Sequence, residues 1–440
     1  MSRINLTADV IVVGSGPGGA TVSKKLTEGG KKVLLLERGG DHRSRFYYGT
    51  YPGALLYSEK MSFLFTEEGV NIVAPNMLGG ATSMFCACAS PPPEWLKNKY
   101  SLDIDTEVND TLAELDIRPL PDHQLGTAST RIAEAAKALG YNWYRQPKFM
   151  FPAKRKNRKK EFKCGASCML GCSCGAKWNA AEWVDDAAVL GAVIKTKAKV
   201  ERILIENRQV VGVEGKLKGK MFTAKAETVI ISAGGLGSPR ILQKSGFEEA
   251  GQGMTMDSTV MVYGFTSEKG TGKEPPMTWS FENDEDGYML STLTDPWLLY
   301  PLIAIKKGIG PALRWLKWNR MHGIMIKLKD DISGGVFANG KISKYLTKSD
   351  QEKLDNAYQV CRKILIEIGA NKNTIFMTPI RGTHPSGTVR VDEMLDNNLQ
   401  TNVKGLYVCD ASVFPESLDR PTVLTIIGLG KRLASHILEL

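Results

Sequence analysis

The sequence has no long uninterrupted apolar run and no N-terminal leader pattern, and it contains few histidines. Its 440 residues include eight cysteines but only five histidines, and 42% of them are hydrophobic and 24% charged. No charged leader and apolar core precede the first motif, A-D-V-I-V-V-G, so no secretory signal is visible and we expect a cytoplasmic protein. Thiols stay reduced in that compartment, which makes disulfides an unfavoured explanation of the cysteines.

Segment 296–320 illustrates the absence of a membrane-spanning helix. Its apolar run is interrupted by Pro301, Lys306 and Lys307, whereas a spanning helix needs roughly 20 apolar residues. Aromatic and aliphatic side chains are interleaved with five basic ones, a composition that suits a segment lying among lipid headgroups. The alternative is a lid packed over an apolar pocket, and either interpretation favours a lipophilic substrate.

Positive charge is concentrated in a second place. The net charge is +10, and seven basic residues lie close together: Lys154, Arg155, Lys156, Arg158, Lys159, Lys160 and Lys163. Such a run is usually a solvated loop. Its functional interpretations are contact with an anionic membrane, at the inner face, or with an acidic electron-acceptor protein. We expect no nucleic-acid binding, because no recognised nucleic-acid module accompanies the charge.

The clearest motif is at the start of the chain. Residues 10–13 predict a buried parallel strand, residues 20–26 the beginning of a helix, and between them lie the glycines of a G-x-G-x-x-G turn, Gly14, Gly16 and Gly19. Glycines there allow a tight turn and a close approach to a pyrophosphate, whose charge the helix N-terminus binds. A second strand, residues 32–36, ends at Glu37, where a ribose hydroxyl would be held. This order of elements predicts a dinucleotide site.

Elements typical of a nucleotide site recur far along the chain. Residues 227–242 read as a strand, a glycine turn and a helix, and residues 405–415 as a strand that ends at Asp410 before the last helix. A nicotinamide-binding domain would be continuous in sequence, whereas these elements lie at both ends and in the middle. This arrangement favours tightly held FAD.

Five motifs in order resemble those of the glucose-methanol-choline (GMC) flavin oxidoreductase family. They are G-S-G-P-G-G-A, L-G-G-A-T-S (78–83), A-G-G-L-G-S-P-R-I-L, H-P-S-G-T (384–388) and L-Y-V-C-D-A-S-V-F-P. Within the family the chain is most similar to long-chain alcohol oxidases and membrane-linked sugar or gluconate dehydrogenases. That similarity is carried by C-G-x-x-C-x-x-G-C, by D-D-A-A-V-L-G-A-V-I and by residues 200–214.

The resemblance implies an α/β fold of two interwoven domains. A doubly wound, Rossmann-like FAD domain would comprise residues 1–98, 164–250 and 376–440. A substrate domain built on an antiparallel sheet would comprise residues 99–163 and 251–375. In agreement, residues 287–294 and 322–329 alternate as half-buried strands, and residues 348–368 have helical periodicity.

The same resemblance implies which residues bind the cofactor. We expect FAD contacts from Gly14, Gly16, Gly19, Glu37, Arg38, Gly79, Gly80, Thr82, Val200, Ala233, Gly234, Asp410, Ala411 and Thr422.

Two residues are candidates for catalysis. His384 begins the H-x-x-G-T motif, whose histidine faces the flavin in the family, and imidazole titrates in the range that a base for an alcohol proton requires. Family members usually carry Asn or His where this chain has Arg420. Arg420 either binds an anionic substrate or stabilises an alkoxide or the reduced flavin, or else forms a surface turn with Asp419.

Four cysteines with spacing C-x3-C-x3-C-x-C form the candidate metal site: Cys164, Cys168, Cys172 and Cys174. The spacing differs from common zinc patterns but resembles segments that bind an iron-sulfur cluster in some membrane-linked dehydrogenases. Structural thiols in a tight loop, or zinc, are the alternatives. Cys86 and Cys88 are expected on one face of a strand, in a packing role.

Together these features predict an FAD-dependent enzyme that oxidises the CH-OH group of a lipophilic or isoprenoid-like alcohol. Electrons would pass to an acceptor other than oxygen, through an iron-sulfur cluster if one is bound. The rival hypothesis is a related flavoprotein that reduces or desaturates a lipid C=C bond.

Overall fold

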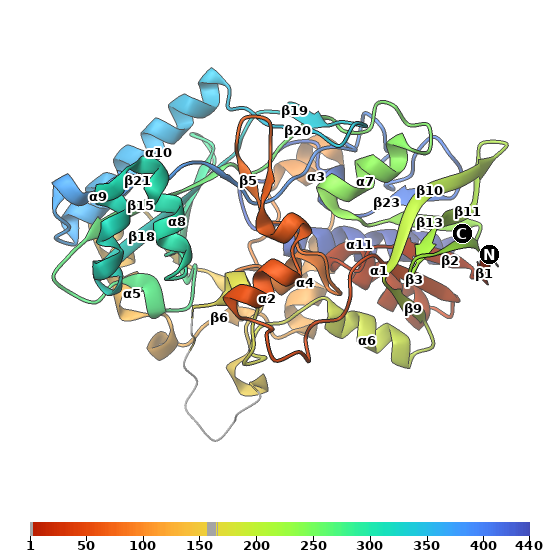
Figure 1. Cartoon of the computed structure of the whole chain (residues 1–440), viewed down its shortest axis with the longest axis horizontal. Helices are drawn as coiled ribbons and strands as arrows, with labels where there is room; N and C mark the ends of the chain where they lie inside the picture. Colours follow the sequence, from red (N-terminus) through yellow and green to blue (C-terminus); the bar gives the residue numbers. More distant parts are fainter. Residues whose placement is uncertain (1–2, 156–163, 165) are drawn as a thin grey trace.

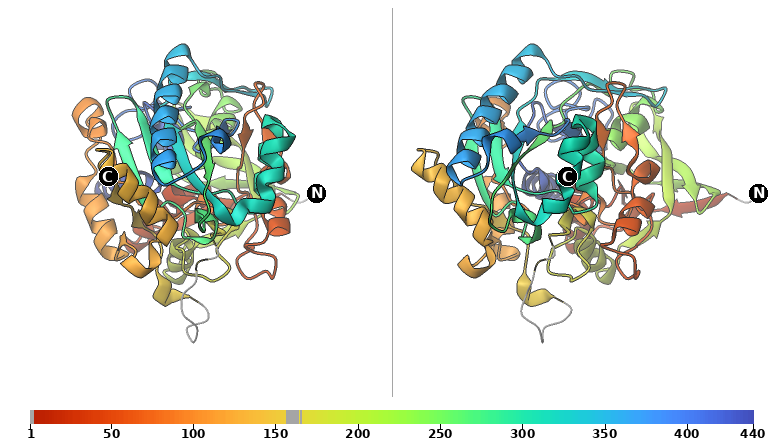
Figure 2. Two further views of the ribbon diagram at one scale, coloured as in Figure 1. Left: turned by 90° about the vertical axis from the view of Figure 1, so that its left-hand side faces the viewer. Right: turned by 60° about the vertical axis from the view of Figure 1, so that its left-hand side comes forward.

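The computed structural model describes residues 3–155, 164 and 166–440. The basic residues Lys156, Arg158, Lys159, Lys160 and Lys163 therefore lie outside the described part of the chain. The molecule is elongated, with a parallel sheet toward one end and an antiparallel sheet toward the other (Figure 1). Both termini lie at the end that holds the parallel sheet, and the left view in Figure 2 shows them on opposite sides of the molecule.

The parallel sheet has the strand order β23-β13-β2-β3-β9. Its strands are β2 (Val10–Val13), β3 (Val33–Glu37), β9 (Val193–Thr196), β13 (Thr228–Ile231) and β23 (Leu406–Val408). All but the edge strand β9 are nearly completely buried, as expected of apolar strands in a sheet covered on both faces. Segments from both chain ends and the middle meet here, so the α/β class predicted from the sequence is confirmed (Figure 1).

Helix α1 (Pro17–Glu28) packs on β2 and β3 of this sheet and against α11 (Val423–Glu439) and α6 (Ala181–Val189), while α7 (Gly234–Gln243) packs against β10 (Ala198–Glu206). Helix α1 begins at Pro17 rather than at residue 20, because proline is well suited to the first position of a helix. A smaller sheet of order β1-β12-β11-β10 adjoins the parallel sheet, with strands β1 (Ile4–Thr7), β10 (Ala198–Glu206), β11 (Gln209–Leu217) and β12 (Lys220–Lys225).

Among the described residues, the antiparallel sheet has nine strands, in the order β4-β5-β22-β15-β18-β17-β16-β7 with β21 paired to β15. They are β4 (Leu64–Phe65), β5 (Asn71–Ile72), β7 (Tyr144–Arg145), β15 (Thr259–Phe265), β16 (Trp279–Asn283), β17 (Tyr288–Thr292), β18 (Met321–Leu328), β21 (Phe376–Met377) and β22 (Arg381–Gly382). Four of these strands, β4, β5, β21 and β22, come from segments that the sequence division assigned to the FAD domain. The domain boundaries themselves stay a prediction.

The prediction that β17 and β18 are half-buried is wrong, because every residue of both strands is buried. Helix α10 (Lys348–Glu367) packs against one face of the sheet. A methionine-rich cluster of strand side chains, including Met261, Met289 and Met325, packs against Tyr300 and Trp318 from segment 296–320. Helix α10 and segment 296–320 therefore cover the sheet together, so that side chains at both even and odd positions of the strands are buried.

The remaining helices and strands connect these layers. They are α2 (Tyr51–Leu56), α3 (Trp95–Tyr100), α4 (Asp105–Glu114), β6 (Arg118–Pro119), α5 (Thr127–Ala138), β8 (Pro147–Lys148), β14 (Gln252–Met254), α8 (Leu299–Ala304), α9 (Ile309–Leu313), β19 (Ser333–Val336) and β20 (Ile342–Ser343). Short 3-10 turns include η1 (Glu59–Ser62), η2 (Gly80–Ser83), η7 (Ile305–Lys307) and η8 (Arg314–Arg320). Within the described residues, no helix has both the length and the apolar composition needed to span a bilayer.

Candidate active site

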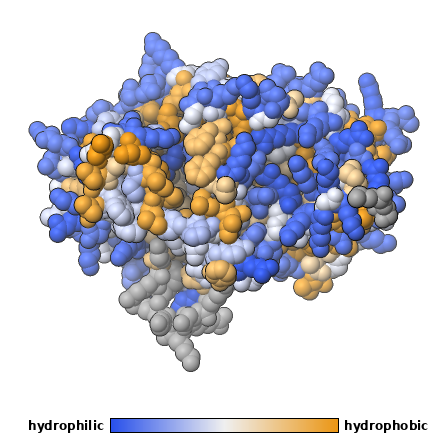
Figure 3. All heavy atoms as spheres, in the orientation of Figure 1, coloured by the Kyte–Doolittle hydropathy of each residue, from blue (hydrophilic) through white to orange (hydrophobic). Residues whose placement is uncertain are grey.

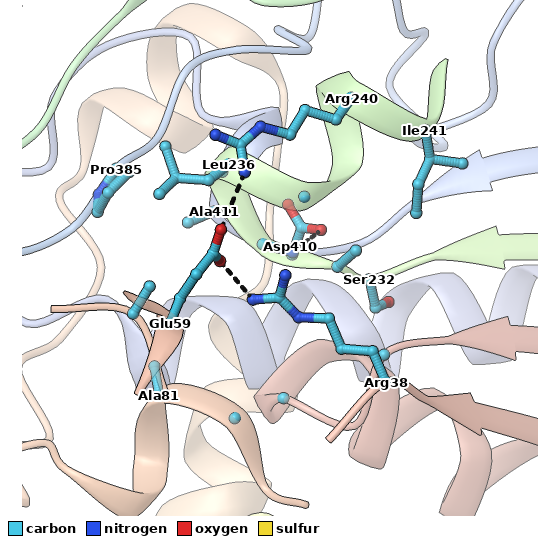
Figure 4. Close-up of a pocket in the computed structure, with 18 of the residues that line it drawn as sticks. Arg38, Glu59, Ala81, Ser232, Leu236, Arg240, Ile241, Pro385, Asp410 and Ala411 are labelled. Carbon is cyan, nitrogen blue, oxygen red and sulfur yellow. Dashed lines mark hydrogen bonds and ion pairs between the residues drawn. The ribbon is translucent and has the colours of Figure 1, made fainter. Parts of the chain in front are cut away.

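A cavity of about 750 Å³ opens where the carboxyl ends of β2, β13 and β23 meet the antiparallel sheet. Its walls come from the turns after these strands, from residues 59–60 and 72–75 on the opposite side, and from the H-P-S-G-T loop (Figure 4). Many of the predicted cofactor residues line it: Gly14, Gly16, Glu37, Arg38, Gly80, Val200, Ala233, Gly234, Asp410, Ala411 and Thr422. His384 also lines it.

The glycines of the two turns, after β2 and after β13, have two different functions. A Cβ on Gly14 would come within 2.2 Å of the Ser232 carbonyl oxygen, and one on Gly19 within 1.9 Å of the Gly14 carbonyl oxygen. These two glycines let backbone pack on backbone. A Cβ on Gly16 or Gly234 would meet no atom within 4 Å, although both residues line the cavity. Their missing side chains leave room for a ligand beside the N-termini of α1 and α7, as a pyrophosphate requires.

Gly79 and Thr82, like Gly19, are not among the residues that line the cavity. The Gly79 N–H donates to Ser15 Oγ at 3.1 Å, and a Cβ on Gly79, whose φ is +90°, would meet Asn179 Oδ1 at 1.9 Å. Thr82 Oγ1 accepts the Ala180 N–H at 2.9 Å. Gly79 thus bonds the glycine turn at Ser15, and Thr82 bonds the segment before α6; direct contact of either residue with a cofactor stays a prediction.

Two buried carboxylates organise the loops around the cavity. Glu37 accepts hydrogen bonds from the Ser15 N–H at 3.0 Å, from Ser15 Oγ at 2.6 Å and from the Gly39 N–H at 2.7 Å. Asp410 accepts from the Gly234 N–H at 2.8 Å and from Ser238 Oγ at 2.5 Å, and burial raises the pKa of this carboxyl. Each carboxylate therefore holds a loop from another strand in place at the cavity wall.

An ion-paired trio crosses the cavity between its two walls (Figure 4). Glu59 from η1 pairs with Arg38, which follows β3, at 2.8 Å and with Arg240 on α7 at 3.3 Å. Burial alone would raise the pKa of the Glu59 carboxyl, but the two guanidinium groups have the larger effect, so this pKa lies below its ordinary value. Two guanidinium groups at one cavity suit a ligand that carries phosphate.

His384 is held by a buried aspartate. Its Nδ1 lies 2.8 Å from Oδ2 of Asp257, whose other oxygen accepts from Ser417 Oγ at 2.6 Å and from the Asp419 N–H at 3.2 Å. Because a carboxylate accepts the Nδ1 hydrogen, Nε2 is the nitrogen left for a substrate. Burial raises the pKa of Asp257, and the hydrogen bond from His384 and the charge of Lys327 outweigh this and lower it.

A buried cation lies beside the same ring nitrogen. The Nζ atom of Lys327, on β18, is 3.2 Å from His384 Nδ1 and donates to Thr383 Oγ1 at 2.6 Å. Burial and the charge of Lys327 lower the pKa of His384, so the imidazole is neutral at neutral pH and is able to accept a proton. Neither Asp257 nor Lys327 was predicted from the sequence, although a lysine within the apolar strand H-G-I-M-I-K-L-K was a detectable signal.

Arg420 is buried, with 4% of its surface exposed, so the surface-turn interpretation is wrong. Its guanidinium group pairs with Asp419 at 2.8 Å, Glu282 at 3.1 Å and Asp284 at 2.6 Å. Burial, which the charge of Arg420 only partly offsets, raises the pKa of Asp419 to about 7. Arg420 is not among the residues that line the cavity, and its contact with a substrate stays a prediction.

The four clustered cysteines form two pairs. Cys164 shares a hydrogen bond with Cys168, and the Sγ atoms of Cys172 and Cys174 lie 3.4 Å apart. A hydrogen bond from Cys174 lowers the pKa of Cys172, although burial opposes this. Across residues 3–155, 164 and 166–440, no group of three or more ligand-type side chains is arranged to hold a metal ion. In this arrangement the described thiols form two pairs and not one set of ligands for a cluster or a zinc ion.

The cysteine loop is nevertheless bonded to the segment that follows the cavity residues Gly80 and Ala81. Lys177, which is buried, donates to the carbonyl oxygens of Cys168 at 3.0 Å, of Phe85 at 3.0 Å and of Ser83 at 2.9 Å. The prediction that Cys86 and Cys88 lie on a strand is wrong, because Ala87 between them has φ +59° and only Cys88 forms an isolated bridge. Cys88 is buried in the methionine-rich cluster, in agreement with a packing role.

Comparison with known proteins identifies the fold and its chemistry. Residues 54–257 and residues 342–430 match two family models that are both described as GMC oxidoreductase. The chain belongs to the GMC oxidoreductase family. It is 29% identical to an uncharacterized protein of Methanocaldococcus jannaschii over 98% of this chain and 100% of that one. It is 26% identical to a long-chain-alcohol oxidase of Arabidopsis thaliana, covering 99% of this chain and 68% of the plant protein.

A solved GMC flavoenzyme has the same fold. The structure of formate oxidase from Aspergillus oryzae matches with a TM-score of 0.72 at 14% identity, over 99% of both chains. The predicted resemblance to the GMC family is confirmed, and the protein is an FAD-dependent oxidoreductase. The open positions at Gly16 and Gly234 and the paired arginines at the cavity fit that cofactor.

Proposed function

We propose that this GMC enzyme oxidises the CH-OH group of a lipophilic alcohol. The observation that carries the proposal is the Asp257–His384 pair at the wall of the cavity that fits FAD. Bound FAD would supply the acceptor for a hydride from the alcohol carbon. His384 would take the hydroxyl proton on Nε2, while Asp257 keeps the other hydrogen on Nδ1 and stabilises the imidazolium that forms.

A lipophilic substrate is supported by the apolar part of the cavity. Ile72, Val73 and Leu236 line it together with His384. Apolar walls favour an alcohol whose chain leaves water on binding. The similarity to a plant long-chain-alcohol oxidase supports the same class of substrate.

Anaerobic reduction of the bound flavin by a panel of substrates tests the reaction. We expect primary long-chain or isoprenoid alcohols to bleach the flavin absorbance and matched alkenes and sugars to leave it unchanged. Reduction by none of the alcohols would reject the proposal, and oxidation of the reduced flavin by an unsaturated lipid would favour the C=C reaction instead.

Substitution of the base and its partner tests the roles of the residues. His384→Gln and Asp257→Asn should each keep FAD but slow substrate-driven flavin reduction by about 100-fold or more, the usual effect of removing a positioned base or fixing the wrong tautomer. Thr255→Val is the control, because Thr255 Oγ1 lies 2.9 Å from Ser386 Oγ and, among the hydrogen bonds of the described residues, makes none to His384. Unchanged rates in the first two variants would remove this pair from the mechanism.

The route by which electrons leave is a separate proposal. The cysteine spacing supports an iron-sulfur cluster that passes electrons to an acceptor other than oxygen, whereas the paired thiols favour a structural loop. Iron and acid-labile sulfide in protein purified without oxygen, at about three to four of each per chain, would establish the cluster. Their absence after reconstitution would leave a structural loop. The cytoplasmic location and the acidic acceptor protein stay predictions.

A further inference from the structure

Segment 296–320 has an inner and an outer face. Tyr300, Ala304 and Trp318 point inward and belong to the cluster that covers the antiparallel sheet. On the outer side, Leu302 is 68% exposed, Ile309 70% and Leu316 79%. Segment 296–320 therefore covers the antiparallel sheet and is not a lid over the cavity, because its residues do not line the cavity.

A second apolar segment, residues 55–65, lies beside the first. Its exposed side chains are Leu55, Leu56, Met61, Phe63 and Phe65. The Leu298 N–H donates to the Tyr51 hydroxyl at 3.1 Å, and Lys306 Nζ lies 5.5 Å from the centre of the Phe65 ring. Apolar side chains accordingly gather over α8, α9 and the β4–β5 hairpin on one face of the molecule (Figure 3). We call the exposed side chains of residues 55–65 and 297–316 the apolar face.

The charges on the two segments of the apolar face are mostly positive, and the exposed acids just beyond residue 65, Glu67 and Glu68, are bonded to Lys341 and Ser343. Residues 296–320 contain no aspartate or glutamate, and four of their basic side chains, Lys306, Lys307, Lys317 and Arg320, are exposed. Lys60 is exposed in the neighbouring segment, whereas the adjacent Glu59 is turned toward Arg38 and Arg240. Apolar side chains surrounded by cations complement an anionic bilayer surface.

The apolar face borders the active-site cavity. Glu59, Lys60, Ile72 and Val73 line that cavity, and Met61, Phe63 and Phe65 follow directly in the chain. Lys60, Met61 and Ser62 have φ values of 49°, 53° and 66°, a backbone conformation that residues other than glycine rarely adopt. The side chains of Met61, Phe63 and Phe65, in and just after this turn, are exposed.

We propose that the apolar face docks on a membrane with anionic headgroups and brings the cavity to the bilayer surface. Leu302, Ile309, Leu313 and Leu316 enter the headgroup region from one segment, and Met61, Phe63 and Phe65 from the other. Lys306, Lys307, Lys317 and Arg320 contact lipid phosphates. The delivery of an alcohol from the bilayer rests on the proposed function, but docking itself does not.

Co-sedimentation of the FAD-loaded protein with vesicles tests docking without any catalytic readout. We expect binding to phosphatidylcholine vesicles that contain about 30 mol% phosphatidylglycerol, and weaker binding to phosphatidylcholine alone, because the cations add attraction to anionic lipid. Each of Leu302→Asp, Leu316→Asp and Phe63→Asp should weaken binding about tenfold, since each withholds one apolar side chain from the lipid. Val189→Asp on α6, where the side chain is 87% exposed, is the matched control and should bind like the unchanged protein.

The outcomes separate docking from its alternatives. Equal binding by all four variants, or sedimentation with neither vesicle, would overturn the proposal. Lipid-independent dimerisation that Leu316→Asp abolishes would also overturn it and would assign the face to a second copy of the chain. If docking is confirmed while no alcohol reduces the flavin, the proposed function fails and the membrane surface stands. Flavin reduction by a detergent-solubilised long-chain alcohol, with no vesicle binding, gives the reverse result: the proposed function stands and docking fails.

Discussion

At the scale of single residues, the position of Lys327 beside His384 sets the pH at which the base works. Burial and this cation both lower the pKa of His384, so the neutral imidazole persists to a lower pH than it would in water. Replacing Lys327 with methionine removes the cation and should raise the pKa of His384. The acid limb of the pH profile for anaerobic flavin reduction should therefore move to higher pH.

Two observations decide that prediction. Lys327→Arg keeps the charge and should keep the acid limb near its original position, whereas a purely structural role for Lys327 would change the rate at every pH alike. An unchanged limb in Lys327→Met would show that the lysine does not control the imidazole.

Arg420 is the second residue whose replacement should have a measurable effect, in this case on the free energy of unfolding. It pairs with three carboxylates, of which Asp419 is buried, Glu282 is half-buried and Asp284 is exposed. Arg420→Met would leave these charges without their cation and should lower the free energy of unfolding by about 3–5 kcal/mol, as is typical of breaking a buried ion pair. Urea denaturation measures this effect.

An exposed ion pair supplies the comparison for Arg420. Arg118 pairs with Asp116 at the surface. Arg118→Met should therefore change the free energy of unfolding by about 0–1 kcal/mol. Similar losses in the Arg420 and Arg118 variants would contradict a structural role for Arg420 and return it to the list of candidate substrate contacts.

At the scale of elements, Glu114 connects three helices behind the glycine turn. It closes α4 and pairs with Lys24 on α1 at 2.5 Å and with Lys431 on α11 at 2.8 Å. Burial raises the pKa of Glu114, but the hydrogen bonds from Lys24 and Lys431 prevail and lower it to about 2. A folded-state pKa below the ordinary value means that the ionised group stabilises the fold above about pH 4.5 and that this contribution is lost as the pH falls toward 2.

Glu114→Gln should therefore destabilise the protein by about 1–2 kcal/mol near neutral pH, after allowance for partial solvent screening. The difference from the unchanged protein should shrink as the pH is lowered below about 4.5. Denaturant titrations at several pH values measure it, with Asp110→Asn on the exposed side of α4 as the control. A difference that does not depend on pH would show that the amide disturbs packing rather than charge.

At the scale of the whole molecule, the FAD cavity joins segments that are far apart in the chain. Residues 13–18, 232–237, 383–385 and 410–411 all line it. A ligand that binds only the folded state stabilises it, by about 4 kcal/mol when its free concentration is 1,000 times its Kd. Removal of FAD should accordingly lower the Tm, and added FAD should restore it.

Gly16→Val separates cofactor binding from folding. The new side chain would point into open space in the cavity-lining turn, so the apoprotein should keep its Tm. It would occupy the place of the ligand, and added FAD should then raise the Tm little or not at all. A full FAD-dependent increase in this variant would contradict the location of the cofactor.

The sequence by itself determined the nucleotide half of the site. Strand β2, the turn at Gly14 and helix α1 follow from neighbouring residues, because apolar strands, glycine turns and helix starts have local signatures. The same is true of β13 and its glycine turn and of β23 with Asp410. His384 was also predictable, since its motif is contiguous.

Only the tertiary structure decided the partners of these residues. Asp257 lies 127 positions from His384 and Glu282 lies 138 from Arg420, so no local pattern connects them. Alternation in β17 and β18 indicated one buried face, but the burial of the second face depends on α10 and on segment 296–320, which come from elsewhere in the chain. Side-chain periodicity indicates which face of an element must be buried, whereas contacts across the fold determine what covers the other face.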